Sequence, residues 1–418
     1  MIFRQLLSRR KRIPADKHGI QRSLIDTDVT QAIRRLQKAG FESYLVGGAV
    51  RDLLLDITPK DFDISTAATP AEVRRLFRRS RIIGRRFRIV HLYFYRGKNM
   101  HIVEVTTFRK DGDEVISDES GCIVRDNLFG AAIDDAERRD FTGNALFYDP
   151  ESGDIIDYVG GYEDIRRQRL RLIGSPAKRF RQDPVRLLRA LRFSSKLNLT
   201  LNQATLRALA PHAPLLDNMS PSRLFDEAVK IFRSGAAADA VARCIKHGVA
   251  PYFLPAAETA GEFFFAVLQH TDQRQRSGQV ISISFVIAAL FWPAVAAQWH
   301  ELRRQKTHSV MAMESALSMA DFSRNHIVPR RVIARAVDLY FLQARFEGQL
   351  NARQARSILR NPLFDRAVAF AALRRDEGGQ QAAQWWSAYH LANDAERKAM
   401  LSQRANENKT SGRHRRQE

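Results

Sequence analysis

The spacing of apolar residues divides the chain into two regions. In the first region, short runs that alternate apolar and polar residues are typical of strands. Strands are expected at Tyr44–Val46, Asp61–Ser65, Ile89–Tyr95 and Ile102–Phe108. Apolar residues three and four positions apart predict helices between them, at Thr27–Ala39, Ala49–Leu55 and Pro70–Phe77. Because the long repeats of a doubly wound parallel sheet are missing, we expect a small mixed sheet.

Strand signals fade after about residue 155, where Ala, Leu and Arg begin to dominate. Helical spacing is clearest at Val185–Leu197, Ser222–Ser234, Ala237–His247 and Met311–Ala320. Polar Gln273–Gln279 is expected to form an exposed connection. The predicted fold class is therefore α+β, with a mixed-sheet domain followed by an all-helical part.

The segment Val280–Trp299 has no charged residue and is long enough to span a bilayer. However, Pro293 interrupts the segment, and Ser282 and Ser284 dilute its apolar character. No second segment of this kind occurs in the sequence. We therefore expect a buried helix of a helical domain and no integral membrane segment.

The net charge points to a polyanionic partner. The 418 residues include 67 Lys and Arg against 46 Asp and Glu, which leaves a formal charge of +21. Nucleic acid is the first candidate partner and an anionic membrane surface the second. A basic surface without a ligand is the alternative, but the charges are clustered. Many arginines lie between Arg74 and Arg88, and a second basic stretch runs from Arg166 to Arg192.

The cysteines and the start of the chain bear on the compartment. Two cysteines, Cys122 and Cys244, exclude a disulfide framework and a Cys-based zinc ribbon. Both are expected to be buried in a reducing compartment, so we predict a cytoplasmic location. In Met1–Arg12 the charges follow the apolar stretch, which is the reverse of a secretory signal. A plain basic arm is expected there, with an organellar presequence as the alternative.

A candidate site for phosphate and metal chemistry follows the first strand. Gly47 and Gly48 let backbone N–H groups approach a phosphate, and Arg51 lies one helical turn further on. Asp61 and Asp63 are two residues apart in an expected strand, so their carboxylates lie on one face. Such carboxylates repel unless a cation lies between them, and Mg²⁺ suits this oxygen donor set. Each part alone is common in turns and strand edges, but their order favours a site.

A third acid, Glu104, lies inside an apolar strand. It is either an edge residue that discourages aggregation or a third member of the metal site beside Asp61 and Asp63.

Four segments together resemble a known family. They are Leu45–Asp52, Lys60–Asp63, Arg138–Ala145 and Asp183–Ala190. In this order they resemble the class II nucleotidyltransferases, the family of bacterial poly(A) polymerases and CCA-adding enzymes. The resemblance covers roughly residues 13–235 and extends more loosely over the helical remainder.

The resemblance implies a role for each matching residue. Asp61 and Asp63 would hold two Mg²⁺ ions and act in catalysis, and the third catalytic acid would be either Glu104 or Asp140. The nucleotide would be contacted by Gly47, Gly48, Arg51, Arg139, Asn144, Asp183 and Arg186. Of these, Asp183 and Arg186 would face the base of the nucleotide. Asp183-Pro184 is also a favourable helix start, which is compatible with that role.

Within the family, Gly84–His91 and Arg12–Ile20 resemble the poly(A) polymerase branch. That branch implies transfer of AMP from ATP to single-stranded RNA 3′ ends. The RNA would be held by Arg85, Arg86, Arg88 and Arg189. Proteins of RNA decay are candidate partners. The alternatives are a CCA-adding tRNA nucleotidyltransferase and a non-catalytic RNA-binding protein on the same fold.

The resemblance also suggests a division into regions. They are a basic arm over residues 1–26, a catalytic head over 27–157, a base-selecting and RNA-binding neck over 158–235, an RNA-binding body and tail over 236–405, and a disordered basic end over 406–418.

Two residues depart from the family pattern. Gly143 stands where a branched apolar residue is usual, which predicts a looser backbone and a lost core contact. Gln182 replaces an acid beside Asp183 and keeps a hydrogen-bonding amide. Both changes bear on nucleotide selectivity and turnover.

Overall fold

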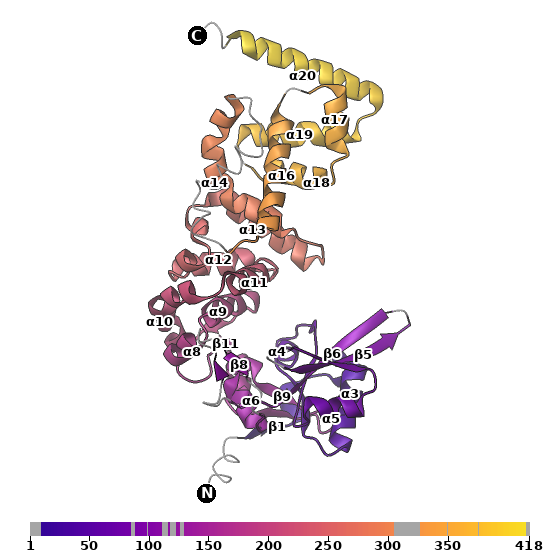
Figure 1. Cartoon of the computed structure of the whole chain (residues 1–418), viewed down its shortest axis with the longest axis vertical. Helices are drawn as coiled ribbons and strands as arrows, with labels where there is room; N and C mark the ends of the chain where they lie inside the picture. Colours follow the sequence, from indigo (N-terminus) through magenta and orange to yellow (C-terminus); the bar gives the residue numbers. More distant parts are fainter. Residues whose placement is uncertain are drawn as a thin grey trace. The chain divides into compact units, whose positions relative to one another are not determined.

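The computed structural model describes residues 10–84, 88–97, 99–110, 116–117, 123–125, 129–304, 327–348, 350–374 and 376–414. The chain forms two compact units, shown in Figure 1. The first contains Met1–Arg186 and Asn198–Ala208, and the second contains Leu187–Leu197 and Leu209–Glu418. The predicted helix Met311–Ala320, Cys122 and the predicted RNA contacts Arg85 and Arg86 lie outside the described residues.

The first unit is built on a mixed sheet of eight strands. Their spatial order is β1 (Lys11–Ile13), β10 (Ile155–Asp157), β9 (Leu146–Tyr148), β2 (Ser43–Val46), β3 (Asp63–Thr66), β6 (Asn99–Thr107), β5 (Ile89–Arg96) and β4 (Ser80–Ile83). Neighbouring strands are antiparallel except for the parallel pair β3 and β6. The expected mixed sheet is confirmed. Part of the predicted basic arm belongs to it, because β1 pairs with β10.

Helices cover this sheet unequally. The helices and turns of the unit are α2 (Ala15–His18), η1 (Arg22–Leu24), α3 (Thr27–Lys38), α4 (Gly48–Leu54), α5 (Pro70–Leu76), α6 (Ala132–Arg138), η2 (Thr142–Asn144), α7 (Gly161–Arg166) and α8 (Pro176–Gln182). Two small strand pairs complete it, β7 (Ile116–Ser117) with β8 (Ile123–Arg125) and β11 (Arg169–Leu170) with β12 (Thr200–Leu201). Helix α3 packs against β2 and β3, and α5 packs against β4 and β5. Thr69 and Glu72 form a capping box at the first turn of α5, which fixes where this helix begins.

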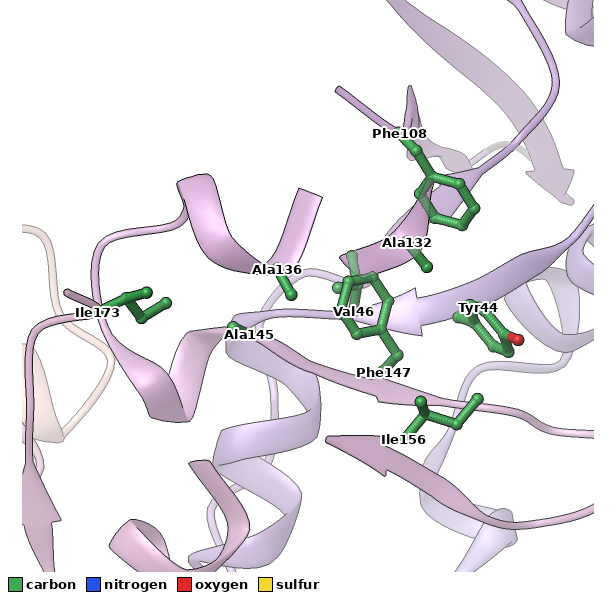
Figure 2. Close-up of a cluster of buried hydrophobic side chains, with 9 residues drawn as sticks. All are labelled: Tyr44, Val46, Phe108, Ala132, Ala136, Ala145, Phe147, Ile156 and Ile173. Atoms are coloured by element: carbon green, nitrogen blue, oxygen red, sulfur yellow. The ribbon is translucent and has the colours of Figure 1, made fainter. Parts of the chain in front are cut away.

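One sheet face carries the residues of interest. Val46, Asp63, Glu104 and His91 are successive register partners across β2, β3, β6 and β5, so they share a face, here called the Asp63 face. Over β2, β9 and β10 this face is covered by α6, and the buried cluster between them is shown in Figure 2. Ala132 and Ala136 of α6 contribute to that cluster because their small side chains allow a close approach.

The second unit is helical, as expected. Its elements are α9 (Val185–Lys196), α10 (Gln203–His212), η3 (Ala213–Asn218), α11 (Pro221–Phe232), α12 (Ala237–Lys246), η4 (Ala250–Tyr252), η5 (Pro255–Glu258), α13 (Gly261–Arg276), α14 (Ile283–Arg304), α16 (Arg330–Glu347), α17 (Ala352–Leu359), α18 (Phe364–Leu373), α19 (Glu377–Leu391) and α20 (Asp394–His414). The boundary between the two units falls inside α9 and again inside α10, and both helices begin in the first unit. The finer division into neck, body and tail stays a prediction.

The apolar segment Val280–Trp299 falls largely in α14, and its middle is buried against other helices of the unit. The Trp292 and Tyr340 rings of this packing lie 5.8 Å apart. The prediction of a buried helix is therefore confirmed. Among the residues that the structure describes, no helix combines the length and apolarity needed to cross a membrane.

Two predictions for this part of the chain need correction. The expected connection Gln273–Gln279 is largely exposed, but it is shorter than predicted, because α13 runs to Arg276 and only residues 277–279 lie outside a helix. The expected disordered end from residue 406 is helical as far as His414, because α20 continues through it. Polar composition does not prevent this helix, since Arg404 lies over the Trp385 ring at 4.4 Å and anchors it to α19.

Candidate active site

The predicted acidic residues come together at the start of β3. Asp63 is the first residue of that strand, and its register partner is Glu104 on β6. Burial raises the pKa of Asp63 to about 6; nearby Glu104 and Asp61 add to the rise, and Arg139 opposes it. Asp61 lies just before the strand and is exposed. Asp61 therefore does not belong to the strand in which it was expected to alternate with Asp63, although its charge raises the pKa of Asp63.

This environment suits a divalent cation. Asp63 is a half-buried carboxylate with two other carboxylates near enough to raise its pKa, and a cation would relieve that repulsion. Among the described side chains, the three-residue group with all ligand atoms within 4.8 Å is a different one, Asp26, Asp28 and His101. Arg96 already pairs with both of those aspartates.

Glu104 has a second neighbour on the same face. Its Oε1 lies 3.4 Å from Nε2 of His91, its register partner on β5. Glu104 therefore lies between a carboxylate and an imidazole. This places it in the acidic group and inside the sheet, since β5 separates it from the edge strand β4. The sequence reading of Glu104 as an edge residue is wrong.

The two glycines shape the turn between β2 and α4. Gly47 has φ +79, a left-handed conformation, and a Cβ there would lie 3.1 Å from Nη1 of Arg139. Gly48 begins α4, and a Cβ on it would lie 3.5 Å from Nη2 of Arg51. The glycines therefore allow two of the predicted nucleotide-binding arginines to lie against the backbone of this turn.

A chain of side chains fixes Arg51. Its guanidinium is buried and donates from Nε to Asp52 at 2.8 Å and from Nη1 to Asn144 Oδ1. The Asn144 amide donates in turn to Asp140 Oδ1 at 2.9 Å. Three residues that the sequence singled out are thus joined through contacts between α4 and η2. Asp140 Oδ1 also accepts the N–H of Phe141 at 2.8 Å, so this carboxylate organises the turn.

Arg139 is held in a similar way. Its Nη2 donates to Asp135 Oδ2 at 2.7 Å, and the same oxygen accepts from Ser65 at 3.3 Å. Asp135 lies four residues before Arg139 on α6, and sequence reasoning missed it. The available signal was an acid four positions before a candidate nucleotide-binding arginine at the end of a helix.

The predicted base-selecting residues are connected to the same region. Arg186 donates to the carbonyl of Arg179 at 2.9 Å, and Arg179 donates to the carbonyls of Arg138, at 2.6 Å, and Arg139. Asp183 directly follows α8. Buried Arg179, also missed by sequence reasoning, therefore links α8 to the segment that carries Arg139. Gln182 accepts from Arg179 at 3.3 Å, so the amide keeps a contact that an acid would make.

Gly143 does not leave a gap in the core. A Cβ at this position would lie 2.7 Å from Cδ1 of Ile165, which occupies that space from α7. The expected loss of a core contact is wrong, because Ile165 supplies the apolar atoms that a branched residue would bring.

The described RNA-contact candidates differ in setting. Arg88 is exposed. Arg189, in the second unit, lies 3.8 Å from buried Glu227, with its guanidinium 5.5 Å from the centre of the Phe193 ring. Their contact with RNA stays a prediction.

Three family models match successive parts of the chain. Residues 43–171 match the poly A polymerase head domain. Residues 198–260 match the probable RNA and SrmB-binding site of polymerase A, and residues 304–418 match the polymerase A arginine-rich C-terminus.

Named relatives agree with these matches. The chain is 35% identical to poly(A) polymerase I of Salmonella typhi over 94% of this chain and 88% of the relative. It is 40% identical to the CCA-adding enzyme of Geobacillus thermodenitrificans over 55% of each chain. The structure of the Bacillus stearothermophilus CCA-adding enzyme in complex with CTP aligns with a TM-score of 0.50 and 25% identity, covering 92% of this chain and 98% of that one. The protein is a nucleotidyltransferase and belongs to the poly(A) polymerase family, to which CCA-adding enzymes are related.

Proposed function

We propose that the protein is a template-independent poly(A) polymerase that transfers AMP from ATP to RNA 3′ ends and releases pyrophosphate. The observation that carries this proposal is the extent of the similarity. The match to poly(A) polymerase I spans 94% of the chain, whereas the match to the CCA-adding enzyme covers 55% of it. The helical second half is thus accounted for by the poly(A) polymerase relatives.

In this reaction the RNA 3′-hydroxyl oxygen attacks the α-phosphorus of ATP, and the bond to the bridging oxygen of pyrophosphate breaks. Asp61 and Asp63 would hold two Mg²⁺ ions, with Glu104 or Asp140 as the third acid. When bound, such ions lower the pKa of the hydroxyl and stabilise charge on the transferred phosphoryl group.

The positively charged residues would hold the triphosphate. Arg51 and Arg139 are oriented by Asn144 and Asp135 before substrate binds, so little conformational entropy is lost on binding. Asp183 and Arg186 would read the base edge, because a carboxylate accepts from and a guanidinium donates to a base. A cytoplasmic location and partner proteins from RNA decay belong to the same proposal.

Primer extension tests the proposal. Purified protein with Mg²⁺ and an unstructured RNA receives ATP, CTP, GTP or UTP separately, and the Asp61→Ala, Asp63→Ala double variant is the control. A long ladder with ATP alone that the double variant abolishes is expected. Short additions that need CTP and then ATP, on tRNA ends only, would support a CCA-adding enzyme instead. Absence of incorporation, with RNA binding equal in both proteins, would favour a non-catalytic RNA-binding protein.

A further inference from the structure

Beyond the acidic group, the Asp63 face continues outward along the hairpin of β5 and β6 (Figure 1). The cross-strand pair after His91 and Glu104 is Tyr93 with Ile102, and the next is Tyr95 with Met100. Since residues two apart in a strand share a face, these side chains lie in line with Glu104. We call Tyr93, Tyr95, Met100 and Ile102 the hairpin face.

The hairpin face is apolar and yet exposed. Tyr95 is 56% exposed, Met100 53% and Ile102 40%. On the same face of the sheet, the side chains over β2, β9 and β10 are buried beneath α6. Exposed apolar groups gathered in this way mark a binding surface more often than single exposed residues do.

Arginines lie along the open edge of this hairpin. β4 pairs with β5 as far as Leu92, and the N–H of Tyr93 then donates to the carbonyl of Arg79 at 2.9 Å. A cavity of about 360 Å³ lies beside this end of β5. Arg35, Arg78 and Arg79 line this cavity together with Tyr93 and Tyr95. The Arg79 guanidinium lies 5.5 Å from the centre of the Tyr95 ring. The acid that also lines the cavity, Asp28, is engaged by Arg96 at 2.7 Å.

We propose that the hairpin face, with Arg78 and Arg79 at its edge, binds the unpaired nucleotides that immediately precede the RNA 3′ end. Aromatic rings beside arginines are the combination that binds single strands without a fixed sequence, by stacking the bases and pairing with the phosphates. The arginines complement a polyanion, which favours RNA over a protein partner at this surface. The inference rests on the proposed function, because a 3′ end placed at Asp63 leaves the preceding nucleotides next to Glu104 and the hairpin face.

A binding assay on the full chain tests the inference without catalysis. A fluorescein-labelled, unstructured oligoadenylate is titrated with protein in EDTA and without ATP, and anisotropy is measured. Tyr95→Ala is expected to weaken binding about tenfold, as loss of one base-stacking contact does. Tyr95→Phe keeps the ring and should bind within about twofold of the parent protein. Leu24→Ala is the matched control, because Leu24 is also 53% exposed but belongs to η1 and not to the hairpin face.

The arginines are tested through salt dependence. In the Arg78→Gln, Arg79→Gln variant, the slope of log affinity against log salt should fall by about 1.4, since each lost phosphate contact on a single strand accounts for ~0.7. In primer extension, Tyr95→Ala should raise KM for RNA about tenfold and leave kcat and KM for ATP unchanged.

Each outcome decides the inference separately from the proposed function. If Tyr95→Ala binds RNA as tightly as the parent protein does, the inference is overturned. This also holds if the variant changes the oligomeric state or the binding of a protein while its RNA affinity stays the same. Equal losses in Tyr95→Phe and Tyr95→Ala also overturn it, because stacking would not be the cause. If the parent protein adds no nucleotide but Tyr95→Ala binds RNA more weakly, the surface assignment stands and the proposed reaction fails.

Discussion

The charge on Asp63 should cost the metal-free protein stability, and the pKa gives the size of that cost. The pKa of Asp63 rises from 3.8 to about 6 on folding, chiefly through burial and then through Glu104 and Asp61. The folded protein therefore binds this proton more tightly than the unfolded chain does. Stability from this group is fully present below pH 3.8 and is lost as pH rises through about 6. At ~1.36 kcal/mol per pH unit, the loss at neutral pH is about 3 kcal/mol.

Replacing Asp63 by Asn removes that cost. In EDTA near neutral pH, Asp63→Asn should raise the free energy of unfolding of the first unit by up to about 3 kcal/mol. The gain should shrink steadily as pH falls towards 4. Added Mg²⁺ should stabilise the parent protein and not the variant, because a ligand that binds the folded state shifts unfolding by mass action.

Urea unfolding at several pH values, with EDTA or Mg²⁺, measures both effects. Asp61→Asn is the control, because Asp61 is exposed and its neutralisation should give a much smaller gain. A gain for Asp63→Asn that is the same at acidic and neutral pH, or no gain at all, would refute the reasoning. The repulsion at Asp63 would then be absent or balanced by lost hydrogen bonds.

Three further changes test the supporting contacts. Gly47→Ala should weaken ATP binding, because the added Cβ would contact Arg139. Gly40 has φ +90 and open space around it, so Gly40→Ala should cost only the ~1–2 kcal/mol of backbone strain. ATP titration measures the first effect and urea unfolding the second. Arg179→Gln should destabilise the protein by about 2–3 kcal/mol and raise KM for ATP, because the carbonyls of Arg138 and Arg139 lose a charged donor. Urea unfolding and steady-state kinetics measure the two effects, and a loss of stability without a change in KM for ATP would contradict the prediction. Arg374→Met should cost about 3–5 kcal/mol, because it removes the buried guanidinium that pairs with the Glu347 carboxylate at 2.8 Å. Glu347→Leu should restore part of the loss in the double variant, and equal stability of the single and double variants in urea unfolding would count against this reasoning.

Local signals predicted the elements of the candidate site, and long-range contacts decided how the elements meet. The alternation in β5 and β6 and the capping residues before α5 act over a few positions, so the sequence located these segments closely. Asp135 and Arg179 escaped notice because their roles depend on which helix packs beside β3 and on where α8 ends. The space left by Gly143 is filled from α7, a contact that its own neighbourhood in the sequence does not reveal.

The position of Asp63 explains why one residue is both perturbed and accessible. On the side of β2, the Asp63 face is covered by α6, and Ser65 on β3 contacts Asp135 of that helix. On the side of β6, the same face is open at Glu104 and along the hairpin face. Asp63 lies at the boundary, so it loses enough water to raise its pKa yet still faces a surface that substrate can reach. A helix that extended over β6 would bury the carboxylate further and close the approach, whereas removal of α6 would expose it and free Arg139. The uneven cover of this sheet is therefore the structural condition for the proposed chemistry at Asp63.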